Sequence, residues 1–239
     1  DEIYVLDRGF VCVPRFSEAG ELIGQFGAEG EGPGDLRRPY AIAIGPDDVV
    51  YVGGLSSFIR KYDSAGVPLS DIKRAEETLS SRVLSIAVDS NGYIYVCSVD
   101  VLHQKVIHKY SRSSGELVGK FADTYAMGNS VDTRAERVFG GEFVDVGGGN
   151  QLLYAQFAPP SIYIYSTEGT MLSKPECRGD QSALPVATAE GESIRFHTPK
   201  LISGPPIWLP NGRFLTTVTA TRREDDGNGV GFQGAVYLD

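Results

Sequence analysis

Hydrophobic residues occur along this chain in short runs, and polar turn residues separate the runs. The segment from residue 39 to residue 69 shows the pattern most clearly. Its apolar runs are 39–44, 49–52, 58–63 and 67–69. Each run alternates between apolar and polar residues or is too short for a helix, and glycine, proline, aspartate or serine lies at each junction. This pattern predicts four consecutive β-strands joined by tight connections.

The same order of runs returns further along the chain. The second copy consists of 84–88, 93–96, 106–110 and 116–118. Its first turn contains Asn91-Gly92, a pair that suits the positive φ angles of a type I′ hairpin. Weaker copies cover 142–169 and 206–237, and residues 3–23 supply half a copy. The segment 71–81 is the one modest candidate for a helix.

Matching positions in the first two full copies predict the hydrophobic core. Tyr51 and Tyr95 occupy the same place in their second strands. The first strands of the two copies contribute Ile42, Ile44, Ile86 and Val88. Because these residues recur with the period of a strand, we expect all of them to be buried between neighbouring sheets.

The repeat also predicts the fold class. One small sheet cannot bury both of its faces alone, so a repeat of this kind needs neighbours and a closed ring. We therefore predict an all-β fold, a β-propeller of four-stranded antiparallel blades. The copies indicate five blades, or six if part of the chain is missing. One domain would cover 1–239, with insertions at about 122–141 and 174–205.

Part of the chain resembles a known repeat family. The residues that carry the resemblance are Pro39, Ala41-Ile42-Ala43-Ile44, Val50-Tyr51-Val52, Ile59-Arg60-Lys61-Tyr62-Asp63 and Gly66, together with the preceding linker 26–36. They resemble an NHL repeat, and the resemblance is best over about 35–125. NHL-type domains are usually six-bladed propellers, so the resemblance implies that fold.

The charge of the chain limits its partners. The formal net charge is −9, and basic residues cluster only as pairs such as Arg37-Arg38 and Arg222-Arg223. An acidic surface repels phosphate backbones, so we expect no nucleic acid partner. No run of 18 apolar residues occurs, so we expect no membrane span. The chain begins at Asp1 within an expected strand, so a leader or an earlier segment could precede it.

Metal and cofactor motifs are weak in this sequence. The cysteines and histidines are Cys12, Cys97, Cys177, His103, His108 and His197. Their spacing forms neither a zinc motif nor a disulfide framework, and we expect Cys12 and Cys97 to be buried. Asp226 and Asn228 form a weak calcium candidate, but Ala235 stands where a calcium loop needs glutamate. We predict no cofactor and no metal otherwise.

The glycines between Gly27 and Gly34 resemble a phosphate-binding loop only superficially. The stretch lacks the lysine and hydroxyl residue of a P-loop and carries Glu29, Glu31 and Asp35. We interpret it as a linker between blades.

The function that fits these observations is binding. Loops on a rigid scaffold carry binding functions, and long connections offer contact surfaces. We predict a non-catalytic protein-interaction or scaffold module with protein partners. One concrete form is an accessory subunit on the extracytoplasmic side of a membrane complex. The candidate partner-binding residues are Tyr125, Met127, Arg134, Arg137, Phe139, Arg178 and Leu184. The alternative is a metal-dependent propeller enzyme, a lyase or lactonase, acting in the central channel.

Overall fold

The structure is a computed structural model. It describes residues 2–76, 82–98, 105–123, 150–156 and 161–175 in full. At 99–100, at 141–147 and in the strands after residue 185, it describes the backbone alone.

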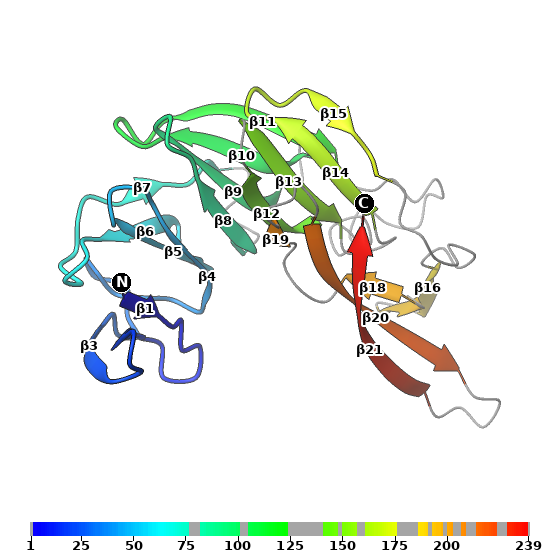
Figure 1. Ribbon diagram of the computed structural model, residues 1–239, viewed down its shortest axis with the longest axis horizontal. Coiled ribbons are helices and arrows are strands. Elements are labelled where there is room, and N and C mark those ends of the chain that lie inside the picture. Colours follow the sequence, from blue (N-terminus) through cyan, green and yellow to red (C-terminus); the bar gives the residue numbers. More distant parts are fainter. Residues whose placement is uncertain are drawn as a thin grey trace. The chain divides into compact units, whose positions relative to one another are not determined.

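Every named element of the structure is a strand, and the strands follow one another in antiparallel sheets (Figure 1). The N-terminal sheet consists of β1 (Glu2–Tyr4), β2 (Val13–Ser17) and β3 (Leu22–Phe26). The next sheet consists of β4 (Pro39–Ile44), β5 (Val50–Gly54), β6 (Phe58–Tyr62) and β7 (Ile72–Lys73). In both sheets the spatial order of the strands is their order in the chain, as in the blades of a propeller.

Two more four-stranded sheets repeat this order. One consists of β8 (Ser85–Val88), β9 (Tyr93–Asp100), β10 (Lys105–Ser111) and β11 (Leu117–Asp123). The other consists of β12 (Gly141–Gly147), β13 (Gln151–Gln156), β14 (Ser161–Ser166) and β15 (Met171–Ser173). These strands confirm the predicted blades of four antiparallel strands.

The C-terminal strands form two further sheets. A hairpin consists of β16 (Val186–Glu190) and β17 (Ser193–His197). The last sheet consists of β18 (Lys200–Ile202), β19 (Ile207–Trp208), β20 (Phe214–Arg223) and β21 (Gly229–Leu238). The segment 174–205, which the sequence suggests is an insertion, therefore contains strands of its own.

The chain divides into two compact units. The first comprises Asp1–Asp100 and Ile107–Gly119, and the second comprises Val101–Val106 and Lys120–Asp239. The prediction of one domain over 1–239 stays a prediction. The first unit contains the residues described in most detail, and it holds the sites discussed below.

Both faces of the sheet β4–β7 are buried in the first unit. Val50 and Val52 pack in one cluster with Phe26 of the N-terminal sheet. Tyr51, which lies between them in β5, packs in a second cluster with Ile86 of β8. Successive side chains of a strand point to opposite faces, so β5 is covered from both sides. Its burial explains why a run of apolar residues, rather than a strict alternation, occupies this strand.

The predicted core is largely confirmed. Tyr51, Tyr95 and Ile86 are 2%, 0% and 6% exposed. Ile42 and Val88 are half-buried and pack against the two clusters. The prediction for Ile44 is wrong, because this residue ends β4 beside the turn to β5 and is 47% exposed.

The fourth strand of this sheet differs from the prediction. The segment 67–69 contributes one isolated bridge, in which Pro68 faces Tyr62. The strand resumes at β7, where Ile72 and Lys73 pair with β6. Proline has no N–H to donate, so it interrupts the ladder. Because Ile72 and Lys73 form a strand, the prediction of a helix over 71–81 is wrong for these two residues.

The turn at Asn91-Gly92 is not type I′. A type I′ turn needs positive φ at both central residues, whereas only Gly92 of this pair has a positive φ, of 94°. The backbone N–H of Asp89 donates to the carbonyl of Tyr93 at 3.0 Å. The Asp89 side chain accepts from the N–H of Tyr93 at 2.8 Å, so the aspartate closes a longer turn.

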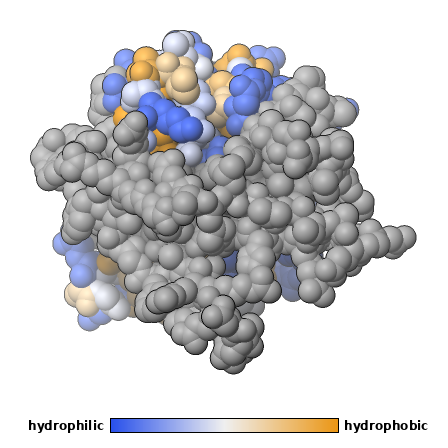
Figure 2. Space-filling model, turned by 90° about the vertical axis from the view of Figure 1, so that its right-hand side faces the viewer, coloured by the Kyte–Doolittle hydropathy of each residue, from blue (hydrophilic) through white to orange (hydrophobic). Residues whose placement is uncertain are grey.

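Some large hydrophobic side chains remain exposed on the outer strands. Leu22 on β3 is 61% exposed, and Met171 on β15 is 56% exposed. On the face in Figure 2, hydrophobic and hydrophilic residues of the described part are interspersed. Scattered exposed hydrophobics are ordinary on protein surfaces and by themselves indicate no site.

Candidate functional site

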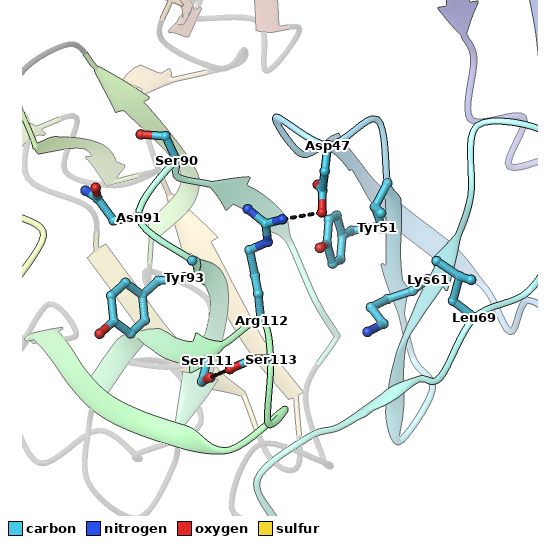
Figure 3. Close-up of a pocket in the computed structure, with 12 residues that line it drawn as sticks. Asp47, Tyr51, Lys61, Leu69, Ser90, Asn91, Tyr93, Ser111, Arg112 and Ser113 are labelled. Atoms are coloured by element: carbon cyan, nitrogen blue, oxygen red, sulfur yellow. Dashed lines mark hydrogen bonds and ion pairs between the residues drawn. The ribbon is translucent and has the colours of Figure 1, made fainter.

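The first unit contains a pocket where two neighbouring sheets end. The turn from β4 to β5 and the turn from β6 to β7 lie at one end of their antiparallel sheet. The corresponding turns of β8–β11 lie beside them, and together they enclose about 550 Å³ (Figure 3). Side chains from both sheets line this space, so its shape depends on how the two sheets pack.

Arg112 connects the two sheets at this pocket. It follows β10, and its guanidinium forms an ion pair with Asp47 in the turn after β4 (Figure 3). Nη1 of Arg112 donates to the carbonyl of Asp89 at 3.4 Å, and its backbone N–H donates to the carbonyl of Gly92 at 2.9 Å. The Nε atom of Arg112 is buried, and no residue in the described part of the chain accepts a hydrogen bond from it.

Lys61 supplies a second positive charge. It lies on β6 directly opposite Tyr51 of β5, and its side chain points into the pocket (Figure 3). Lys61 is half-buried, and the structure gives it no ion pair with any residue that it describes. An ammonium group in this position can donate hydrogen bonds to a carboxylate or another anionic group of a ligand.

Tyr51 forms part of the wall between these charges. Burial raises the pKa of its phenol, while the charge of Arg112 lowers it and the charge of Asp47 raises it. The net shift is upward, so the phenol stays protonated at neutral pH. Tyr51 therefore offers the pocket a neutral hydroxyl rather than a phenolate.

The far side of the pocket is polar and uncharged. Ser90, Asn91 and Ser113 line it together with Tyr93. The hydroxyls of Ser111 and Ser113 are 3.1 Å apart and share a hydrogen bond. These groups can exchange hydrogen bonds with a polar ligand. The pocket thus combines two cations, one carboxylate committed to Arg112, and several hydroxyls.

The structure tests some of the chemistry considered from the sequence. Cys12 and Cys97 are buried free thiols, as predicted, and burial raises the pKa of the Cys12 thiol. His108 is fully buried on β10. Among the residues that the structure describes, no three histidine, cysteine or carboxylate side chains come together as a metal site.

The glycine-rich segment is a linker between β3 and β4, as interpreted from the sequence. The N–H of Leu36 donates to the carbonyl of Ala28 at 2.7 Å, and the N–H of Gly32 donates to Asp35 at 2.9 Å. Asp35 therefore fills the turn where a phosphate would have to bind.

The partner-binding residues predicted from the sequence are not placed. Tyr125, Met127, Arg134, Arg137, Phe139, Arg178 and Leu184 lie outside the described residues. The calcium candidates Asp226 and Asn228 also lie outside them. No helix in the described part of the chain is long and apolar enough to cross a membrane.

The sequence alone does not indicate that the residues lining the pocket come together. Asp47 and Arg112 are 65 positions apart and belong to different copies of the repeat. Each lies in or beside a turn, where charged residues are common, so neither forms a recognisable motif. The usable signal is that β6 carries two adjacent basic residues, Arg60 and Lys61, between apolar ones.

Comparison with known proteins shows the fold. No family model matches the chain, and no curated protein matches it in sequence. The WD40 repeats of RRP9 share 12% identity over 99% of this chain and 77% of that chain, with a TM-score of 0.58. A Bacteroides caccae protein of unknown function shares 12% identity over 98% of this chain and 72% of that one, with a TM-score of 0.57.

A third similar structure is the WD40 β-propeller domain of Doa1. It shares 12% identity over 98% of this chain and 78% of that chain, with a TM-score of 0.51. Identity this low supports conclusions about the fold and not about the function. Together with the four-stranded antiparallel sheets, these likenesses show that the chain has the β-propeller fold.

Proposed function

We propose that this protein is a non-catalytic interaction module whose turn pocket receives a polar or acidic side chain of a protein partner. The pocket at the end of β4–β7 and β8–β11 carries the proposal. It holds the ammonium of Lys61, to which the described residues offer no ion pair, and the Arg112–Asp47 ion pair fixes its walls. A rigid scaffold that presents an uncommitted cation in a hollow is suited to recognise an anion.

A capture experiment with the full chain tests this function. The immobilised protein is expected to retain a partner from the cells that produce it, and Lys61→Glu is expected to lose that partner. Lys73→Glu is the matched control, because Lys73 is an exposed lysine on β7 outside the pocket. If Lys73→Glu releases the partner as strongly as Lys61→Glu does, the pocket is not the binding site.

The predicted insertions provide a second contact region in this proposal. Residues Tyr125, Met127, Arg134, Arg137 and Phe139 in 122–141, and Arg178 and Leu184 in 174–205, are of types common at interfaces. Ala122 and Asp123 end β11 and Gly141 begins β12, so the test leaves these residues in place. Replacing 124–140 with a glycine-containing turn is expected to weaken partner binding without lowering the melting temperature. A variant that binds normally would remove this segment from the interface.

A finer form of the proposal is an NHL-type propeller that serves as an accessory subunit on the extracytoplasmic side of a membrane complex. The NHL-like residues around β4–β6 support the repeat type. Cys12 and Cys97 are buried, and buried thiols resist oxidation in an oxidising compartment. Fractionation of cells that express the complete gene tests the location, and recovery in the cytoplasm alone would contradict it.

A further inference from the structure

We propose a second binding site, for an acidic polypeptide segment, at the end of the first unit's sheets opposite the pocket. Its centre is Tyr40 at the start of β4. The guanidinium carbon of Arg8 lies 4.0 Å from the Tyr40 ring centroid, and that of Arg82 lies 4.7 Å from it. Nη1 of Arg82 also donates to the Tyr40 hydroxyl at 3.4 Å. One half-buried ring thus holds two exposed guanidinium groups near each other.

Three separate connections supply this cluster. Arg8 lies in the loop from β1 to β2, Arg82 precedes β8, and Tyr40 follows the linker from β3. In a meander of antiparallel strands, these connections lie at the end away from the turns that form the pocket. The cluster and the pocket therefore have no residue in common, and the proposal does not rest on the proposed function.

The positive charges of the cluster exceed its negative charges. Arg37 and Arg38 lie in the same linker, immediately before β4. Arg37 pairs with Glu31, and both side chains are exposed, at 60% and 75%. Among the described residues, no carboxylate pairs with Arg8, Arg38 or Arg82. Like charges held close repel one another, and a bound anion relieves that repulsion.

The backbone holds Arg38 in an unfavourable conformation. Its φ is +41°, in the left-handed region that residues with a Cβ seldom adopt. The carbonyl of Arg37 accepts from the N–H of Leu55 at 3.2 Å. A Cβ on Gly54 would lie 2.4 Å from the Arg38 carbonyl oxygen, so the linker is pressed against β5. Strain of this kind tends to occur at functional sites, where it presents a side chain in a fixed place.

An exposed aromatic residue lies beside the cluster in sequence. Phe10 is 84% exposed, two positions after Arg8. The carboxylate of Asp7 accepts from the N–H groups of Gly9 and Phe10 at 2.8 and 2.9 Å, which orders the loop. Arginine, tyrosine and a large apolar side chain are the residue types that dominate binding hot spots.

These features favour a polypeptide with acidic residues beside an apolar one. A carboxylate can form paired hydrogen bonds with a guanidinium, and Phe10 offers contact to a neighbouring apolar side chain. Nucleic acid fits less well. The four arginines are a local cluster, and the net charge of −9 on the chain repels the parts of a phosphate backbone that extend past them.

Fluorescence anisotropy with the full chain tests the proposal. The probe is a short labelled peptide in which glutamate alternates with leucine, and the reference peptide has glutamine in place of glutamate. We expect the acidic peptide alone to bind, and the variant Arg8→Gln/Arg82→Gln to bind it about tenfold more weakly. The control Lys73→Gln/Lys174→Gln removes the same charge from two exposed lysines outside both the cluster and the pocket, and it is expected to change the affinity less than twofold. Equal losses in the two variants would overturn the proposal.

Two further measurements distinguish binding from folding and from other ligands. Arg38→Gly relieves the backbone strain, so we expect an unchanged or higher melting temperature together with weaker peptide binding. A lower melting temperature with unchanged affinity would show that Arg38 is structural and would count against the site. Tighter binding of a single-stranded oligonucleotide of equal charge would also overturn the choice of a polypeptide. Because Lys61 keeps its own test, failure here leaves the proposed function untouched.

Discussion

Gly66 lies directly against the ring of Phe26. Gly66 is in the turn after β6, and Phe26 ends β3 in the preceding sheet. A Cβ at Gly66 would lie 2.5 Å from Cδ1 of Phe26, and the φ of Gly66 is +88°. Within the second unit, Gly169 has the same relationship to Phe121, at 2.8 Å. The turn after a third strand therefore packs on the outer strand of the sheet before it, and only glycine fits there.

The third-strand tyrosines take part in the same contact. The rings of Phe26 and Tyr62 have centroids 4.6 Å apart, and those of Phe121 and Tyr165 are 5.6 Å apart. The Tyr62 hydroxyl donates to the carbonyl of Gly34, in the linker between the two sheets, at 2.8 Å. This arrangement connects each sheet to the one before it.

We predict that Gly66→Ala destabilises the protein by about 3 kcal/mol. About 1 kcal/mol comes from the positive φ and the remainder from the clash with Phe26. The matched control is Gly20→Ala, because Gly20 has a φ of +82° in an equivalent turn, and no atom of a described residue lies within 4 Å of the added Cβ. Urea denaturation of both variants measures the difference, and equal losses would show that Phe26 moves aside.

The stability of the protein is expected to fall at alkaline pH. Burial raises the pKa of Tyr62 to about 12, and it raises the pKa of Tyr165 to about 12 as well. A tyrosine in the unfolded chain ionises near pH 10. The folded state therefore keeps protons that the unfolded state releases, so the stabilisation is complete below pH 10 and is lost as the pH rises towards 12.

The variant Tyr62→Phe isolates one part of this effect. At pH 8 it should lose about 1 kcal/mol, because the hydrogen bond to Gly34 is gone. Between pH 10 and 12 its stability should fall less steeply than that of the wild type. Denaturant melts across this range give the slopes, and parallel slopes would mean that Tyr62 does not titrate as described.

Arg60 is predicted to hold the linker in place. Its side chain is 7% exposed and pairs with Asp71, and its Nε donates to the carbonyl of Asp35 at 2.8 Å. Removing one member of a buried pair leaves the other charge without a partner, so Arg60→Ala should cost about 3–4 kcal/mol.

A double-mutant cycle with Asp71→Ala separates the ion pair from the linker contact. If the ion pair matters, the double variant should be more stable than the sum of the single losses implies. Strict additivity in chemical denaturation would show that Arg60 acts through its hydrogen bonds to the linker carbonyls of Asp35 and Glu31, and not through the ion pair.

Cys12 is predicted to resist alkylation in the folded protein. It is 9% exposed, and burial raises the pKa of its thiol, so the reactive thiolate is scarce. Cys97, which is fully buried, should behave in the same way. Mass spectrometry after iodoacetamide treatment in buffer and in denaturant checks this, and rapid labelling of Cys12 in buffer would contradict the burial.

The sequence by itself determined the strands and their grouping. Tyr51 and Tyr95 recur at equivalent places because a strand repeats its environment every second residue. The turn glycines are likewise visible, since a positive φ selects glycine locally. The fourth strand was less predictable, because Pro68 interrupts a ladder that resumes only at Ile72.

Only the tertiary structure decided which residues of different copies meet. The pairing of Asp47 with Arg112 joins positions 65 residues apart, and Tyr40 meets Arg8 and Arg82 from two other connections. Local periodicity carries no information about such contacts, because they depend on how far one sheet is rotated and shifted against the next. The exposure of Ile44 has the same origin, since burial depends on where the neighbouring sheet ends as well as on the alternation within a strand.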